Sequence, residues 1–180
     1  MSEPLRVAIF GATSAIAEAC ARAWAMRGAR LFLAGRRGDA LRAMARDLEI
    51  RGAQSVATWA GDLADPAAHP ALLAEMDRAL GTPDVALLAW GTLTDQARAE
   101  AEPAYAAAEI ATNLGAPAAL LLALAPRFAA KRSGVIACIT SVAGERGRQS
   151  NFVYGAAKGG LQRLLEGLRH RLHREGVTVL

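Results

Sequence analysis

The chain has 180 residues, of which 53% are hydrophobic, and this suits one globular domain with an ample core. The net charge of +4 is spread along the chain and only 5% of residues are aromatic, which excludes the basic, aromatic-rich stripe of a nucleic-acid-binding protein. Two cysteines and three histidines offer neither a disulfide framework nor a metal-ligand spacing, so we expect no metal site.

The first elements in chain order predict a strand, a turn of small residues and a helix. Residues 5–10 form an apolar, β-branched run typical of a strand. A helical pattern covers residues 15–27 and ends at Gly28. This order opens a dinucleotide-binding unit, because the helix N-terminus presents unpaired N–H groups to a pyrophosphate. Thr13 and Ser14 can add hydroxyl donors, although an ordinary turn between a strand and a helix carries small residues too.

The rest of the chain alternates between strands and helices. The expected strands are residues 30–34, 55–60, 84–90, 135–140 and 176–180, and the expected helices are residues 38–51, 67–80, 103–131 and 152–174. The third of these helices is expected to be continuous, with a bend at Pro117 or Pro126. Apolar strands separated by helices indicate an α/β fold with a doubly wound parallel sheet, Rossmann-like and in three αβα layers, in one domain over residues 1–180.

The second strand is followed by Gly35, Arg36 and Arg37. NAD-dependent enzymes place an acidic residue here, which accepts a hydrogen bond from the ribose 2′-hydroxyl. That acid is absent, and the planar guanidinium of Arg36 suits a 2′-phosphate. Within the family resemblance given below, this favours NADP(H) over NAD(H), while the alternative is a solvated turn.

Tyr154 and Lys158 lie four residues apart in the last expected helix, so they share one helix face. An ammonium beside a phenol favours the phenolate, which makes the phenol a usable proton donor or acceptor near neutral pH. Ser141, 13 residues before Tyr154, could hold a substrate carbonyl. A solvated helix face can carry the same pair. The pair therefore indicates a catalytic site only in combination with the strand, turn and helix upstream.

Taken together, these motifs resemble the short-chain dehydrogenase/reductase family over residues 5–180. The family's TGxxxGxG loop matches at Gly11, and its serine and YxxxK motif match at Ser141, Tyr154 and Lys158. The resemblance implies that these three residues and Asn113 are catalytic. The residues that it implies for the cofactor are Gly11, Thr13, Ser14, Ala15, Ile16, Arg36, Asp62, Leu63, Gly91, Tyr154 and Lys158.

The chain departs from the family pattern in two places. The second and third loop glycines are Ala15 and Ala17, and an added Cβ limits how closely backbone can approach a phosphate. The family's NNAG stretch retains only Gly91, with the large ring of Trp90 before it, near the expected cofactor groove. The loop is also similar to that of a subgroup that includes reductases of keto-sugars on polyprenyl phosphate carriers.

The resemblance implies an oxidoreductase that interconverts a ketone and a secondary alcohol, with a small-molecule substrate and Tyr154 as general acid/base. A non-catalytic dinucleotide-binding sensor or an assembly subunit is the alternative. The two long helices resemble the family's subunit-contact helices and imply a homodimer or homotetramer. Family members continue past the sixth strand, so we expect residues beyond Leu180. The longest apolar run, residues 116–126, is too short to span a bilayer, and no signal peptide precedes the first strand, which predicts a cytoplasmic chain.

Overall fold

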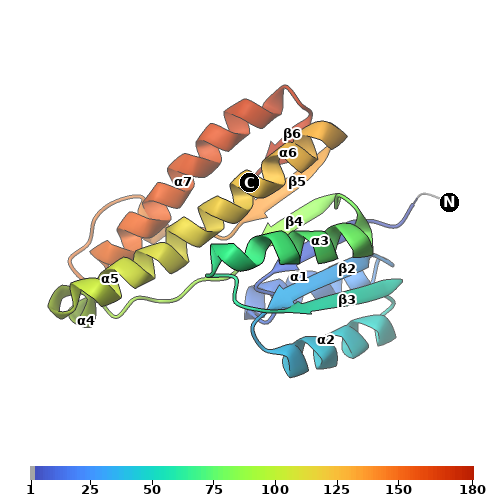
Figure 1. Ribbon diagram of the computed structural model, residues 1–180, viewed down its shortest axis with the longest axis horizontal. Helices are drawn as coiled ribbons and strands as arrows, with labels where there is room; N and C mark the ends of the chain where they lie inside the picture. The colour runs from blue at the N-terminus through green and yellow to red at the C-terminus, as the bar shows by residue number, and fades with distance from the viewer. Residues whose placement is uncertain (1–2) are drawn as a thin grey trace.

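The computed structural model describes residues 3–180 as a six-stranded parallel sheet with helices on both faces (Figure 1). The strand order is β3-β2-β1-β4-β5-β6. The strands are β1 (Arg6–Phe10), β2 (Arg30–Gly35), β3 (Ser55–Ala60), β4 (Val85–Leu88), β5 (Gly134–Cys138) and β6 (Val177–Val179). The order reverses between β1 and β4, and this switch point is where ligands bind in open parallel sheets. The predicted Rossmann-like fold is confirmed.

The helices cross between successive strands. They are α1 (Ala15–Ala25), α2 (Gly38–Ile50), α3 (His69–Leu80), α4 (Gln96–Ala101), α5 (Pro103–Ile110), α6 (Ala116–Lys131) and α7 (Phe152–His173). A π-helical turn covers Ala111–Gly115, and short 3-10 helices cover Pro66–Ala68 and Val142–Gly144.

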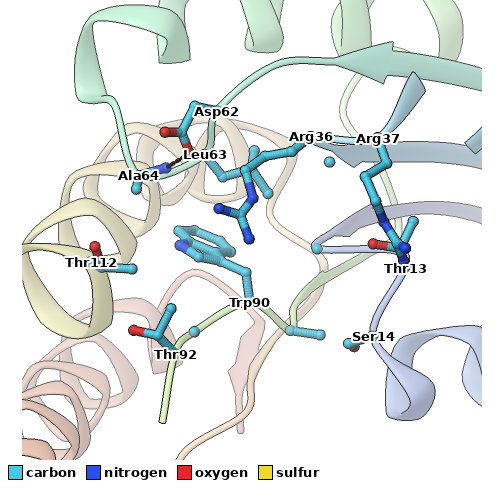
Figure 2. Close-up of a pocket in the computed structure, with 14 residues that line it drawn as sticks. Thr13, Ser14, Arg36, Arg37, Asp62, Leu63, Ala64, Trp90, Thr92 and Thr112 are labelled. Atoms are coloured by element: carbon cyan, nitrogen blue, oxygen red, sulfur yellow. Dashed lines mark hydrogen bonds between the residues drawn. The ribbon is translucent and has the colours of Figure 1, made fainter. Parts of the chain in front are cut away.

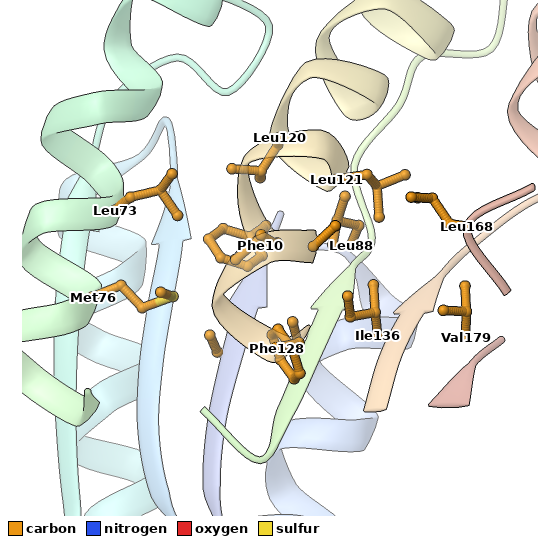
Figure 3. Packing of buried hydrophobic residues seen from close by; sticks show 14 of the residues in the cluster. Phe10, Leu73, Met76, Leu88, Leu120, Leu121, Phe128, Ile136, Leu168 and Val179 are labelled. Carbon is orange, nitrogen blue, oxygen red and sulfur yellow. The ribbon is translucent and has the colours of Figure 1, made fainter. Parts of the chain in front are cut away.

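Strand side chains alternate between two buried faces, which is why the strands are apolar almost throughout. On β1, Val7 and Ile9 belong to the cluster beneath α1 and α2. Ala8 and Phe10 belong to the opposite cluster, which α3, α6 and α7 cover (Figure 3). In that cluster Phe128 of α6 is fully buried. Because helices cover both faces of the sheet, we expect a ligand site at the carboxyl ends of its strands.

The elements differ from the sequence predictions in three details. The expected helix 103–131 is present, but it changes hydrogen-bond register in the π turn, in which the N–H of Ala116 donates to Ala111 O, five residues back. Pro117 has no N–H and cannot donate the α-helical hydrogen bond to Asn113 O, so the helix changes register just before it. Helix α4 was not predicted, although Asp95 caps it by accepting from Arg98 N at 3.1 Å. Strand β4 ends at Leu88 rather than at Trp90.

The helical stretch Pro103–Lys131 is, by length and composition alone, apolar enough to cross a membrane. Core helices pass the same test, and here Leu120, Leu121 and Leu124 of α6 are buried against the sheet. The finding is therefore weak evidence for a membrane span.

Asp84 fastens the amino ends of β1 and β4 to the end of α6. Its carboxylate accepts from the backbone N–H of Arg6 at 2.9 Å and from the Arg6 guanidinium, and it pairs with Lys131. Desolvation raises the pKa of Asp84, but the hydrogen bonds from Arg6 and Lys131 outweigh it and hold the pKa at about 2. This clamp lies at the end of the sheet opposite the carboxyl ends.

Candidate functional site

A cavity of about 580 Å³ opens at the carboxyl ends of β1, β2 and β4 (Figure 2). Its lining comes from the turns after these strands and after β3, and from the π turn. The lining residues are Gly11, Thr13, Ser14, Gly35, Arg36, Arg37, Asp62, Leu63, Ala64, Ala89, Trp90, Gly91, Thr92 and Thr112. The structure thus brings together seven residues that the sequence assigned to the cofactor, from Gly11 to Gly91.

Gly11 is required where β1 turns into the cavity. Its φ is +85°, and a Cβ there would lie 2.7 Å from Trp90 N and 2.8 Å from Ala89 C. Both the left-handed backbone and the close approach exclude a larger residue. The absent side chain lets the turn before α1 lie directly against the backbone that follows β4.

Ser14 caps the N-terminus of α1, where its Oγ accepts from Ala17 N at 3.2 Å. The hydroxyl hydrogen remains available to a ligand, as do the first N–H groups of the helix. Ala17 is fully buried in the cluster beneath α1, so its Cβ fills core rather than cavity. Ala15 and Ile16 are exposed and do not line the cavity. These two predicted cofactor residues therefore lie beside the cavity and not in it.

Positive charge faces the cavity from the turn after β2. Arg36 and Arg37 are exposed and line it. Neither takes part in any ion pair found among residues 3–180. Asp62 lies after β3, and its Oδ1 accepts from Ala64 N at 3.0 Å, which holds the turn (Figure 2). An unpaired guanidinium pair beside a helix N-terminus suits a phosphorylated ligand.

The candidate catalytic residues adjoin the cavity through Gly91. A Cβ on Gly91 would lie 2.7 Å from Asn113 Oδ1 and 3.5 Å from Lys158 Nζ. Lys158 is 3% exposed, its Nζ donates to Ile139 O at 3.1 Å, and the same nitrogen lies 5.9 Å from the centre of the Tyr154 ring. Burial lowers the pKa of Lys158. Lys158 therefore lies behind Gly91, next to the cavity, with its ammonium near the Tyr154 ring.

Ser141 lies at the end of the chain segment that follows β5. Its Oγ accepts from Ala143 N at 3.2 Å, which leaves its hydrogen free to donate. The short helix after it packs closely on α7, because a Cβ on Gly155 would lie only 2.6 Å from Ala143 O. Gln162 on α7 also donates to Ser141 O at 3.0 Å. These contacts hold Ser141 beside the first turns of α7, where Tyr154 lies.

A hydrogen-bonded cluster around Glu109 was not predicted. Its Oε2 accepts from Thr92 Oγ1 and Thr94 Oγ1, each at 2.8 Å. Asn113 is fully buried, and its Oδ1 accepts from Thr92 N at 3.0 Å. The Asn113 amide nitrogen donates to Thr92 Oγ1 at 3.0 Å and to Glu109 O at 3.1 Å. The four-residue spacing of Glu109 and Asn113 was the available signal, and the cluster fastens the loop after β4 to the helix.

Comparison with known proteins identifies the family. A family model described as short chain dehydrogenase matches residues 6–180. The chain belongs to the short-chain dehydrogenase family. It is 41% identical over 174 residues to an uncharacterized oxidoreductase of Mycobacterium tuberculosis, which covers 97% of this chain and 70% of that relative. It is 33% identical over 173 residues to granaticin polyketide synthase putative ketoacyl reductase 1 of Streptomyces violaceoruber, covering 95% and 63% respectively.

Solved structures share the fold. A metagenomic short-chain oxidoreductase in complex with NADP superposes with a TM-score of 0.87 and 32% identity, over 97% of this chain and 79% of that chain. NAD+-bound xylitol dehydrogenase has a TM-score of 0.88 at 19% identity, over 96% of this chain and 66% of that chain, and shows the fold alone. One neighbour carries NADP and the other NAD, so a cofactor preference does not follow from them. None of these names points to the keto-sugar subgroup, which stays a prediction.

The residues of the cavity fit a nicotinamide dinucleotide. Gly11 lines the cavity at the turn between β1 and α1, where family members bind the pyrophosphate. The capped end of α1 and the unpaired Arg36 guanidinium supply donors and positive charge on the same cavity. The Asp62–Leu63 turn closes the far side.

Proposed function

We propose that the chain interconverts a ketone and a secondary alcohol, with Tyr154 as general acid and base. The observation that carries the proposal is the buried ammonium of Lys158 beside the Tyr154 ring, next to a cavity suited to a dinucleotide. The ammonium places positive charge beside the side chain that we assign to exchange a proton with the substrate oxygen.

Each residue has a distinct task in this proposal. When bound, the dinucleotide supplies or takes up the hydride at the carbonyl carbon. Tyr154 donates a proton to the carbonyl oxygen in reduction and removes it in oxidation. Ser141 donates a hydrogen bond to the same oxygen, because its own acceptor side is used by Ala143 N. The Asn113 amide is committed to Thr92 and to Glu109 O, so we assign it the positioning of the loop after β4.

We propose NADP(H) as the preferred cofactor. Arg36 stands at the end of β2, where an acid would select NAD(H), and it is unpaired on the cavity side. Arg37, which was not among the predicted cofactor residues, also lines the cavity, with its side chain beside Thr13 (Figure 2). An Arg36→Ala variant is expected to weaken NADPH binding at least tenfold and to leave NADH binding within twofold. Equal losses for both cofactors would contradict the assignment.

We further propose a small-molecule carbonyl or alcohol substrate, a cytoplasmic location and a homodimer or homotetramer built on α5, α6 and α7. The exposed side chains of Ile110, Leu122 and Phe152 on these helices support an oligomer. Sedimentation of the purified chain tests the oligomer, and a monomer at micromolar concentration would contradict it.

The proposed reaction is tested by NADPH consumption, followed optically, with a panel of ketones and keto-sugars. Wild-type turnover should disappear in Tyr154→Phe, whereas the NADPH dissociation constant should stay within threefold, because Tyr154 does not line the cavity. Retained turnover would exclude the role of Tyr154. Tight NADPH binding without turnover of any substrate in the wild type would instead favour a dinucleotide sensor.

A further inference from the structure

Trp90 is the only aromatic residue among those that line the cavity within residues 3–180. It is the second residue after β4, and Gly11 lies directly against it, since a Cβ on Gly11 would lie 2.7 Å from Trp90 N and 2.8 Å from Trp90 Cβ. The indole is partly buried and packs against the core cluster that α6 covers. Its ring therefore presents a rigid wall to the cavity.

Core packing does not account for this indole. Its Nε1 is buried and has no hydrogen-bond partner within the described part of the chain. A buried donor without an acceptor destabilises the folded state, and a phenylalanine would fill the same place without that cost. The cavity retains about 580 Å³ with the ring in place, so the indole forms a wall and does not fill the space.

The order of the cavity residues tells which part of a dinucleotide meets this wall. Figure 2 shows Thr13, Ser14 and Arg37 at one end, near the start of α1, where a pyrophosphate binds. Arg36 at the end of β2 meets the ribose 2′ position. The adenine base must then lie farther from α1 than this ribose. Trp90 lies on that side, and the Arg36 side chain points toward it across the cavity (Figure 2).

We infer that the Trp90 indole is the stacking platform for the adenine base, with the Arg36 guanidinium across the cavity from it. The inference rests on the proposed dinucleotide function and adds a specificity-determining residue to it. Stacking on an aromatic face contributes substantially to the binding of nucleobases. Trp90, which departs from the family pattern, therefore increases the affinity for the adenosine half of the dinucleotide.

The test measures binding of 2′,5′-ADP, NADPH and nicotinamide mononucleotide by calorimetry. Trp90→Leu keeps an apolar side chain but removes the aromatic face, and it should weaken 2′,5′-ADP and NADPH binding by about 5- to 100-fold. Trp90→Phe keeps an aromatic face and should bind both within about fivefold of the wild type. Nicotinamide mononucleotide, which lacks the adenine, should bind both variants as it binds the wild type.

Fluorescence gives an independent readout, since the chain has three tryptophans. Binding of 2′,5′-ADP should quench wild-type emission, and this quenching should be lost in Trp90→Phe, which retains Trp24 and Trp59. A Trp90→Leu variant that binds 2′,5′-ADP as tightly as the wild type, or more tightly, would overturn the inference while leaving the dinucleotide function intact. A wild-type chain that binds neither NADPH nor 2′,5′-ADP would overturn both.

Discussion

Replacing Lys158 by methionine should stabilise the fold while abolishing turnover. Lys158 is 3% exposed and has one hydrogen-bond acceptor, Ile139 O, for its three N–H donors. It is in no ion pair found among residues 3–180. An unpaired buried ammonium is costly, so Lys158→Met is expected to raise the free energy of unfolding at pH 7 by about 1–3 kcal/mol. Urea unfolding at several pH values measures this difference.

The pH dependence of that difference provides a second check. Burial lowers the pKa of Lys158 below its ordinary value of 10.5, so the folded state releases the proton before the unfolded state does. Wild-type stability therefore gains a favourable contribution as the pH rises from the folded pKa toward 10.5, and the variant lacks this gain. The advantage of Lys158→Met should shrink above neutral pH. The control Lys131→Met removes a paired lysine and should destabilise the fold, because Asp84 loses a partner. A Lys158→Met variant less stable than the wild type at pH 7 would refute this reasoning.

Two further predictions concern stability. Asp84→Asn should lower the free energy of unfolding by about 1–3 kcal/mol at pH 7. The pKa of Asp84 is lowered from 3.8 to about 2, so its contribution is present above 3.8 and is lost as the pH falls through 2; a difference that persists at pH 2 in urea titrations would contradict the clamp. Gly91→Ala places a Cβ 2.7 Å from Asn113 Oδ1 and should destabilise the fold by about 1–3 kcal/mol in thermal unfolding, and reduce turnover. The control Gly167→Ala meets nothing within 4 Å on α7 and should be neutral or stabilising, so similar losses in both variants would argue against crowding at Gly91.

The sheet could be predicted because its strands are short apolar runs between helices. The turn at Gly11 and the helix after it could also be predicted, because both depend on local backbone conformation. The π turn could not be predicted, because Gly115 and Pro117 predict a weakened or bent helix without specifying a change of hydrogen-bond register. The end of β4 at Leu88 depends on the neighbouring strands and is not encoded locally.

The site was predicted to the extent that its residues form motifs in chain order. Glu109 was missed because a glutamate on an alanine-rich helix normally faces solvent, and only the folded loop brings Thr92 and Thr94 to it. Ala15 and Ile16, which were assigned to the cofactor by their place in the loop, are exposed, and their cofactor role stays a prediction. Arg37 was also missed, because its place on the cavity depends on how the turn after β2 folds and not on the spacing of a motif.

The central claim is that Tyr154 and Lys158 serve a hydride transfer to a carbonyl, and isotope transfer tests it most directly. NADPH deuterated at the transferable position of its nicotinamide is incubated with the ketone and keto-sugar panel, and products are analysed by mass spectrometry. The account predicts deuterium on the carbinol carbon with the wild type and none with Tyr154→Phe, although that variant binds NADPH. Equal labelling by both proteins, or NADPH binding by the wild type with no labelled alcohol from any substrate, would contradict it.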